Sequence, residues 1–341
     1  MPHTRIDVRT TRTFRVASSN TCRISSARAL GALGSRCSQR TLANGNPRCS
    51  ASASSVVPSK YVEVAHKLAD AAGDITSRYF RTNLHIENKG DESPVTIADR
   101  AAEAEMREII NSAFPEHGVF GEEEGLDLRE GEYVWVLDPI DGTRSFVTGK
   151  PLYGTLIGLV KNGVPILGII DQAILQERWV GVSGQPTTLN GEMIRTRACS
   201  GLDEAYMYST TPLMFDETSV EGYAALMKQV KEPLYGCDCY AYGLLAAGHC
   251  DLVVEADLKP YDFMALIPII EGAGGFVTNW KGERMGFDPK HLTDGSGDVL
   301  PTEIIAACDE KTHRSALQVI QDGLPANELA AFKSALSSLR K

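Results

Sequence analysis

The chain has 341 residues, of which 43% are hydrophobic and 23% are charged, and its formal net charge at pH 7 is −10. These values are typical of a globular protein with one large or two medium-sized domains. The acidic balance argues against nucleic acid as a partner. No apolar run approaches the roughly 20 residues that cross a bilayer, so no membrane partner is expected.

The first 57 residues differ in composition from the rest of the chain. They contain nine arginines, no lysine and one acid, Asp7, so their formal charge is +8; subtracting +8 from −10 leaves −18 for residues 58–341. An arginine- and serine-rich segment with few acids is typical of an organelle transit peptide. We expect residues 1–57 to be a disordered transit peptide that directs the protein to the chloroplast stroma. The mitochondrion is the less favoured destination, and a basic tail that stays attached is the alternative.

The eight cysteines have no spacing typical of a disulfide framework or a zinc site. Cys237 and Cys239 are separated by one residue, and such a pair can in principle hold a metal. On a strand, however, the pair simply shares one face, and free cysteines are often buried. We expect these thiols to be structural.

The segment after residue 58 begins with helix signals and continues with strand signals. Val62, Ala65, Leu68 and Ala72 form an apolar stripe at helical spacing, and Asn162-Gly163 is a typical hairpin turn. The expected helices cover 59–80 and 97–113. The expected strands cover 119–121, 133–137, 155–161, 166–171, 177–182 and 187–193.

The second half alternates short strands with helices, and two adjacent glycines, Gly274 and Gly275, end one of the helices. The expected strands cover 205–209, 252–255, 276–279 and 304–307. The expected helices cover 219–229, 240–247, 260–272 and 311–321. We predict a fold of the α/β (α+β) class, with an N-terminal half over 58–190 and a C-terminal half over 191–341.

The most informative segment is 135–146, in which an apolar strand is followed by two aspartates and a Gly-Thr pair. Asp138 and Asp141 supply hard oxygen ligands for cations. Gly142 and Thr143 offer backbone N–H groups where a helix begins, a position that suits a phosphate. Metal carboxylates next to an anion site predict metal-assisted hydrolysis of a phosphate ester.

Three further acidic positions accompany this motif. Asp99 stands at the start of an expected helix, Glu122 opens a run of three glutamates, and Asp262 follows a Pro-Tyr pair. Singly, each has an ordinary explanation, namely a first-turn helix acid, a solvated charge run or a polar residue at a helix N-terminus. Their combination with the aspartates of the motif is what indicates a site.

Taken together, the segments 135–146 and 259–275 resemble the inositol monophosphatase superfamily of Mg²⁺-dependent, lithium-sensitive phosphatases. The resemblance extends from about residue 60 to the C-terminus. It implies a layered α/β/α/β/α sandwich, a Mg²⁺ cofactor, a small-molecule phosphate ester as substrate and a homodimer.

The resemblance also implies a set of metal ligands. These are Glu122, Asp138, the backbone carbonyl of Ile140, Asp141 and Asp262. The chain departs from the family at one nearby position, because Tyr261 replaces the tryptophan that usually precedes the last metal ligand. We expect this change to leave the metal position intact.

The same resemblance assigns further roles around the metals. Asp99, with the Thr143 hydroxyl as its partner, corresponds to the acid that orients the nucleophilic water, and Glu122 also counts among the catalytic groups. The backbone N–H groups of Gly142 and Thr143 are expected to hold the phosphate. Lys89 matches a substrate-binding lysine that is common in a loop of this family.

Three segments, 142–156, 168–179 and 235–243, resemble the branch of the superfamily that hydrolyses histidinol phosphate. Histidinol carries an ammonium and a titratable imidazole, so acidic side chains suit it better than they suit neutral inositol. Asp238 and Glu255 are the expected substrate-binding acids, with a structural role for each as the alternative. The resemblance implies an L-histidinol-phosphate phosphatase of histidine biosynthesis. The alternatives are an inositol-1-phosphate or sugar-1-phosphate phosphatase and, in another class, a non-catalytic metal-binding scaffold.

Overall fold

The structure is a computed structural model that describes residues 57–83, 86–88, 94–287 and 302–339. All of them belong to one compact unit that runs from Ser52 to Lys341. The predicted transit peptide, apart from Val57, and the predicted substrate-binding Lys89 lie outside the described residues.

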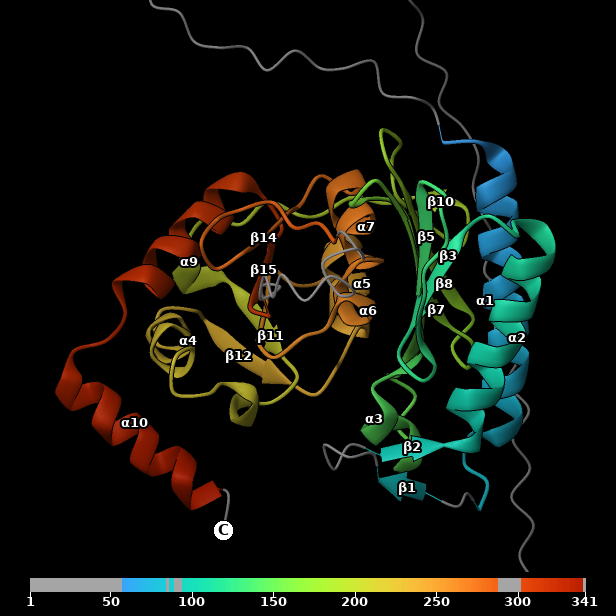
Figure 1. The fold of residues 1–341 in the computed structure, drawn as a ribbon. Coiled ribbons are helices and arrows are strands. Elements are labelled where there is room, and N and C mark those ends of the chain that lie inside the picture. Colours follow the sequence, from blue (N-terminus) through green and yellow to red (C-terminus); the bar gives the residue numbers. More distant parts are fainter. Residues whose placement is uncertain (1–56, 84–85, 89–93, 288–301, 340–341) are drawn as a thin grey trace, which may run out of the picture. The chain divides into compact units, whose positions relative to one another are not determined.

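The larger of two main sheets contains eight strands in the order β10-β9-β8-β7-β6-β5-β3-β4 (Figure 1). Neighbouring strands are antiparallel except β3 and β5. The hairpin turn predicted at Asn162-Gly163 is confirmed, with positive φ at both residues. The strands are β3 (Gly118–Gly121), β4 (Gly125–Asp127), β5 (Tyr133–Asp141), β6 (Gly154–Lys161), β7 (Val164–Gln172), β8 (Glu177–Val182), β9 (Thr188–Leu189) and β10 (Glu192–Met193).

Two long helices, α1 (Ser59–Tyr79) and α2 (Ile97–Ala113), cover one face of this sheet. Leu68 and Met106 from the helices are fully buried against Trp135 of β5. The side chains of β5 point alternately to the two faces of the sheet, and they are apolar on both faces. The reason is that α1 and α2 cover one face and a second layer of helices covers the other. This double burial explains why β5 reads as a continuous apolar run.

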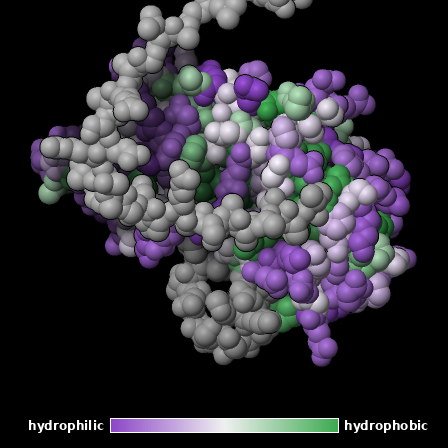
Figure 2. Space-filling view, turned by 90° about the horizontal axis from the view of Figure 1, so that it is seen from above, coloured by the Kyte–Doolittle hydropathy of each residue, from purple (hydrophilic) through white to green (hydrophobic). Residues whose placement is uncertain are grey.

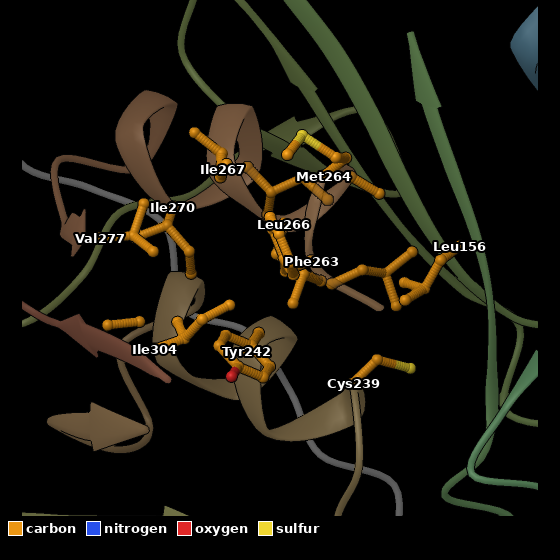
Figure 3. Close-up of a cluster of buried hydrophobic side chains, with 14 of the residues drawn as sticks. Leu156, Cys239, Tyr242, Phe263, Met264, Leu266, Ile267, Ile270, Val277 and Ile304 are labelled. Atoms are coloured by element: carbon orange, nitrogen blue, oxygen red, sulfur yellow. The ribbon is translucent and has the colours of Figure 1, made fainter. Parts of the chain in front are cut away.

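The middle layer consists of α5 (Tyr240–Ala246), α6 (Pro260–Phe263) and α7 (Leu266–Gly272). A single buried cluster joins these helices to both sheets. Figure 3 shows it, with Leu156 of the larger sheet on one side, Ile304 of the smaller sheet on the other and Phe263 between them.

The smaller sheet has the order β12-β11-β13-β15-β14, and three helices pack on its outer face. Leu226, Ile320 and Leu336 from these helices share one buried cluster with alternate residues of β13. The predicted five-layer fold is therefore confirmed. The strands are β11 (Tyr206–Ser209), β12 (Glu232–Tyr235), β13 (Leu252–Glu255), β14 (Phe276–Asn279) and β15 (Ile304–Ala307), and the helices are α4 (Val220–Met227), α9 (Glu310–Asp322) and α10 (Ala326–Leu339).

The middle layer approaches the larger sheet through a row of three glycines. Gly158, Gly168 and Gly181 lie opposite one another on β6, β7 and β8. A Cβ atom on Gly168 would overlap the carbonyl oxygen of Ala265, and one on Gly181 would overlap the backbone nitrogen of Ile269. These glycines therefore let the backbone of α7 and the residues before it lie directly on the strands.

The structure corrects two sequence-based expectations. The helix expected over 260–272 is two helices, because Met264 and Ala265 form a turn between α6 and α7. Pro268 explains the break, since proline has no N–H for the carbonyl four residues earlier. Cys237 and Cys239 lie in the turn before α5 rather than on a strand, but both thiols are free and buried, as expected for structural cysteines.

Several elements had not been expected. They are the helix α10, the strands β4 and β12, the ribbon of β1 (Ile86–Asn88) and β2 (Pro94–Thr96), and two single 3₁₀ turns, η1 (Leu202–Glu204) and η2 (Pro212–Met214). The helix start expected at Gly142 and Thr143 is the short α3 (Thr143–Val147). The boundary predicted between residues 190 and 191 falls inside the β9–β10 hairpin of the larger sheet, whereas the first residues of the smaller sheet are those of β11; as a domain boundary it stays a prediction.

The face of the molecule in Figure 2 is mainly hydrophilic, with smaller apolar groups between the polar residues. In the described part of the chain, none of the helices combines the length and the apolar composition of a membrane span.

Candidate active site

The end of β5 brings two of the predicted carboxylates together. In a regular strand, residues three positions apart point to opposite faces. Here Asp138 lies opposite Leu156 and Asp141 lies opposite Gly154, so β5 contains one extra residue between them. Such a bulge reverses the alternation of faces, and Asp138 and Asp141 can therefore serve the same site.

Asp262 joins this pair from the start of α6. Its Oδ2 accepts a hydrogen bond of 2.7 Å from the backbone N–H of Lys259, which fixes the carboxylate at the helix N-terminus. Carboxylate oxygens of Asp138, Asp141 and Asp262 all lie within 4.8 Å of one another. Two segments, the end of β5 and the start of α6, thus bring together carboxylates that are up to 124 positions apart in the sequence.

Glu122 and Ile140 lie beside this cluster. Glu122 lines the same cleft as Asp141 and Asp262, and its backbone N–H donates to the carbonyl of Leu137, the residue before Asp138. The carbonyl oxygen of Ile140 accepts a hydrogen bond of 3.1 Å from the Thr143 hydroxyl. Their roles as metal ligands stay predictions.

The three clustered acids destabilise one another. Burial, followed by the charges of Glu122 and Asp141, raises the pKa of Asp138 well above its ordinary value. Burial and then the charge of Asp238 do the same for the pKa of Asp141, and burial raises the pKa of Asp262 to about 8. Asp138 is buried and Asp141 and Asp262 are half-buried, and carboxylates with this pattern form a site that a divalent cation would stabilise; their hard oxygen atoms fit Mg²⁺.

The turn after Asp141 is built around Gly142, which has φ of 83°. A Cβ atom at this position would lie 2.7 Å from Oδ2 of Asp238, so the close approach also requires glycine. Oδ2 of Asp238 accepts a hydrogen bond of 2.8 Å from the Ser145 hydroxyl of α3. The two predicted regions, 142–143 and Asp238, are therefore in direct contact.

Asp99 and Thr143 make different contacts from the predicted pair. Oδ2 of Asp99 accepts hydrogen bonds from the N–H and the hydroxyl of Thr96, at 2.9 and 2.6 Å, and so caps α2. The Thr143 hydroxyl donates to Ile140 instead of Asp99. Oδ1 of Asp99 is buried without a protein hydrogen-bond partner, and burial raises the pKa of this acid.

Glu255 is held firmly at the end of β13. Its Oε1 accepts from the N–H of Thr210 and its Oε2 from the hydroxyl of Tyr242, both at 2.9 Å. Burial raises the pKa of Glu255, and burial also raises the pKa of Asp238. Glu255 and Asp238 line the same cleft as the carboxylate cluster.

The cleft has a volume of about 250 Å³. Besides the predicted residues, its lining contains side chains that sequence reasoning missed, namely Arg144, Thr210, Met214, Cys239, Tyr242 and Leu258. Arg144, Cys239 and Tyr242 lie within segments that the sequence analysis singled out, but it assigned them no role, and Thr210, Met214 and Leu258 belong to no recognised motif. A larger groove of about 820 Å³ lies between α1 and the β8–β9 edge, and it contains none of the predicted site residues.

Comparison with known proteins shows that the layered fold and the acidic cleft belong to a phosphatase. The sequence profile of the inositol monophosphatase family matches residues 58–324, and the chain belongs to this family. It is 50% identical over 266 residues to "Bifunctional phosphatase IMPL2, chloroplastic" of Arabidopsis thaliana, covering 77% of this chain and 75% of the relative. It is 33% identical over 261 residues to a histidinol-phosphatase of Chlorobaculum parvum, covering 72% and 95%.

Solved structures agree with this assignment. The structure of an inositol monophosphatase from Zymomonas mobilis is similar with a TM-score of 0.68 and 45% sequence identity. The similarity covers 77% of this chain and 98% of that one. The recognised family and fold are thus confirmed.

Proposed function

We propose that this phosphatase is Mg²⁺-dependent and hydrolyses L-histidinol phosphate. The observation that carries the proposal is the position of two further acids, the half-buried Asp238 and the buried Glu255, in the cleft that contains the carboxylate cluster. The printed names of relatives support it, since one of them is a histidinol-phosphatase and another a bifunctional phosphatase.

The proposed metal ligands are Glu122, Asp138, Asp141, Asp262 and the carbonyl of Ile140. Bound Mg²⁺ would supply positive charge that stabilises the phosphoryl group as its charge develops. Without it, the mutual repulsion of the carboxylates would oppose the binding of an anionic ester. The carboxylate oxygens of Asp138, Asp141 and Asp262, which lie within 4.8 Å of one another, support a hard cation at this position.

The remaining groups orient the substrate and the attacking water. The Oδ1 atom of Asp99 is directed by the bonds that Thr96 makes to the other oxygen, so it can accept a hydrogen bond from a water. In the proposal, the N–H groups of Gly142 and Thr143 bind the phosphate. Asp238 and Glu255 then face the alcohol part of the ester.

The alcohol must decide the specificity, because the phosphate is common to all candidate esters. Histidinol offers cationic donors, and a carboxylate that accepts from a charged donor contributes roughly 1.5–3 kcal/mol. Glu255 already accepts two bonds from the protein, but a carboxylate has about four acceptor positions. Both acids can therefore bind a cationic group without losing their present partners.

The test of this proposal is the Asp238→Asn variant, assayed on histidinol phosphate and on inositol 1-phosphate. We expect kcat/KM for histidinol phosphate to fall by about tenfold to a hundredfold, the kinetic equivalent of one lost charge-assisted bond. The neutral ester serves as the internal control and should lose much less. Equal losses on both esters would assign Asp238 a structural role.

The second candidate is an inositol-1-phosphate or sugar-1-phosphate phosphatase, favoured by the word "bifunctional" in the name of the Arabidopsis relative. The wild-type protein decides between the candidates: a higher kcat/KM on inositol 1-phosphate would favour the second. A protein that binds Mg²⁺ but hydrolyses none of these esters would be the non-catalytic scaffold.

Location and assembly complete the proposal. The basic composition of residues 1–57 and the word "chloroplastic" in the name of the Arabidopsis relative support import into the chloroplast stroma. An import assay with isolated chloroplasts and mitochondria tests this, and exclusive uptake by mitochondria would contradict it. The homodimer stays a prediction from the family, and sedimentation equilibrium would test it.

A further inference from the structure

Glu103 is a fully buried acid that the proposed reaction does not use. It lies on α2 with an exposed fraction of 0%. Its carboxylate accepts hydrogen bonds from the backbone N–H groups of Glu123 and Glu124, at 2.8 and 3.0 Å, and from Nε of Arg107 at 2.9 Å. Burying a charge is costly unless it is paired, and here three donors pair it.

Two of the three partners of Glu103 are the residues directly after a proposed metal ligand, Glu122. Glu122 begins the turn between β3 and β4, and Glu123 and Glu124 complete it. On its other side, the N–H of Glu122 donates to the carbonyl of Leu137 on β5, at 3.1 Å. The backbone of Glu122 is therefore fixed by β5 on one side and by α2, through Glu103, on the other.

Gly121 makes this arrangement sterically possible. A Cβ atom at residue 121 would overlap the carboxylate of Glu103. The glycine before Glu122 therefore provides the space that the Glu103 carboxylate occupies beneath the turn. Without such space, the carboxylate could not reach two successive N–H groups.

Glu103 also stands one helical turn after Asp99, so both lie on the same face of α2. The charge of Glu122 acts on Asp99 and contributes to its raised pKa. One face of α2 thus carries the acid proposed to orient the water and the acid that holds the β3–β4 turn.

We propose that Glu103 is a positioning residue that holds Glu122 at the metal site by binding the two N–H groups that follow it. This rests on the proposed metal-dependent activity. Residues that orient metal ligands typically change metal affinity by about 10–100-fold when they are substituted. Loss of the Glu103 contacts should therefore weaken Mg²⁺ binding more than it alters the KM for the ester.

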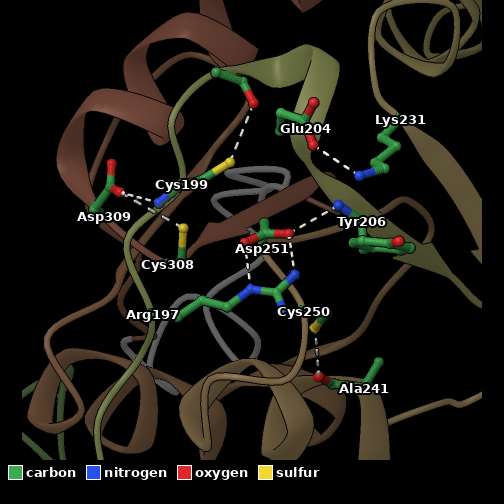
Figure 4. A network of polar contacts seen from close by, with 11 residues as sticks. Arg197, Cys199, Glu204, Tyr206, Lys231, Ala241, Cys250, Asp251, Cys308 and Asp309 are labelled. Atoms are coloured by element: carbon green, nitrogen blue, oxygen red, sulfur yellow. Dashed lines mark hydrogen bonds and ion pairs between the residues drawn. The ribbon is translucent and has the colours of Figure 1, made fainter.

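The test uses Glu103→Asp, which keeps the negative charge but shortens the reach by one methylene. A matched control is Asp251→Glu, which keeps the charge and changes the reach by the same amount. Asp251 is also buried, also binds an arginine, Arg197, and also accepts from a backbone N–H, that of Tyr206 (Figure 4). It precedes β13, at the end of the strand opposite Glu255.

Two readouts are needed for each variant: Mg²⁺ binding to the protein without substrate, by titration calorimetry, and the Mg²⁺ dependence of kcat and KM. For Glu103→Asp we expect the Mg²⁺ dissociation constant to rise at least about tenfold, with a KM at saturating Mg²⁺ close to that of the wild type. Asp251→Glu should leave both values unchanged. Equal Mg²⁺ affinity in Glu103→Asp and wild type would overturn the proposal.

Further variants separate the remaining outcomes. If Glu103→Asp does not fold, Glu103→Gln replaces it, since Gln retains the length and one acceptor oxygen; wild-type Mg²⁺ affinity there would likewise overturn the proposal. Asp141→Asn, which alters a proposed ligand itself, tests the metal site. If Asp141→Asn and wild type bind Mg²⁺ equally, the proposed function fails; if only Asp141→Asn loses Mg²⁺, the role of Glu103 fails alone.

Discussion

Asp141 shows the conflict between stability and activity within a single side chain. It is close to Asp138 and Asp262, and burial and neighbouring charges raise its pKa well above the ordinary value. At the same time its Oδ2 accepts a hydrogen bond of 2.6 Å from the N–H of Cys239, which fixes its orientation. The residue is thus well ordered and electrostatically unfavourable in the absence of a cation.

Asp141→Asn should therefore remove activity and stabilise the metal-free protein. The amide oxygen can still accept from Cys239, whereas the repulsion within the cluster is reduced. We expect kcat to fall by roughly 100-fold or more, and the free energy of unfolding in EDTA to rise by about 1 kcal/mol. Urea denaturation and steady-state kinetics measure the two effects. Wild-type turnover at saturating Mg²⁺ would contradict the role of Asp141.

At the scale of elements, the glycine row fixes the distance between α7 and the larger sheet. Gly168→Ala should destabilise the protein by about 3 kcal/mol, because the new Cβ overlaps backbone that cannot rotate away. Gly158→Ala is the matched control, since its Cβ would lie 3.2 Å from the nearest backbone atom and requires only a small shift. Chemical denaturation should show a larger loss in the free energy of unfolding for Gly168→Ala than for Gly158→Ala. Equal losses would contradict the proposed role of the glycine row.

The contact of α1 and α2 with β5 contains a buried histidine. Nδ1 of His117 accepts a hydrogen bond of 3.2 Å from Nε1 of Trp135, and its ring stacks on Phe114 at 4.6 Å. Burial lowers the pKa of His117 below its ordinary value of 6.5. The native state therefore binds this proton less readily than the unfolded state does.

Linkage then gives the sign of the pH dependence. Well above pH 6.5 the histidine is neutral in both the native and the unfolded state, so it does not change the free energy of unfolding with pH. As the pH falls below 6.5, the unfolded state gains the proton first, and the free energy of unfolding falls by at most about 1.4 kcal/mol per pH unit from this group. His117→Phe keeps the aromatic contacts and should lose less stability than wild type between pH 6.5 and 5. Urea denaturation at several pH values measures the difference, and parallel curves would rule out the contribution of His117.

Sequence reasoning located the long elements and the acids but not the contacts that fix them. The predicted strands 133–137 and 252–255, which end just before Asp138 and at Glu255, were recognisable because they are short apolar runs. Glu103 was not, because an acid in an amphipathic helix is usually solvated and its burial depends on Gly121. The glycine row also escaped notice, since its members lie on three strands and become neighbours only through sheet register.

At the scale of the whole molecule, the N-terminal segment should be dispensable for the reaction. The compact unit begins at Ser52, and Val57, which lies within the predicted transit peptide, is buried against the core. A chain that begins at Ser52 therefore keeps every described contact. We expect it to match the full chain in melting temperature and in kcat. A large loss in either would show that the preceding residues contribute to the folded enzyme.

The residues that line the cleft differ in how strongly the surrounding structure constrains substitution. The segment that carries Asp262, a proposed metal ligand, continues into Ala265 and α7, whose backbone lies against the glycine row, so bulky substitutions at Gly168 or Gly181 should also shift Asp262. Thr210, Met214 and Leu258 also line the cleft, and they lie in loops or in a single 3₁₀ turn. Evolution can therefore exchange one alcohol for another by altering a few loop side chains while the hydrolytic chemistry stays untouched. For the same reason, a protein engineer who wants a new substrate should randomise these loop residues and keep the segment that carries Asp262.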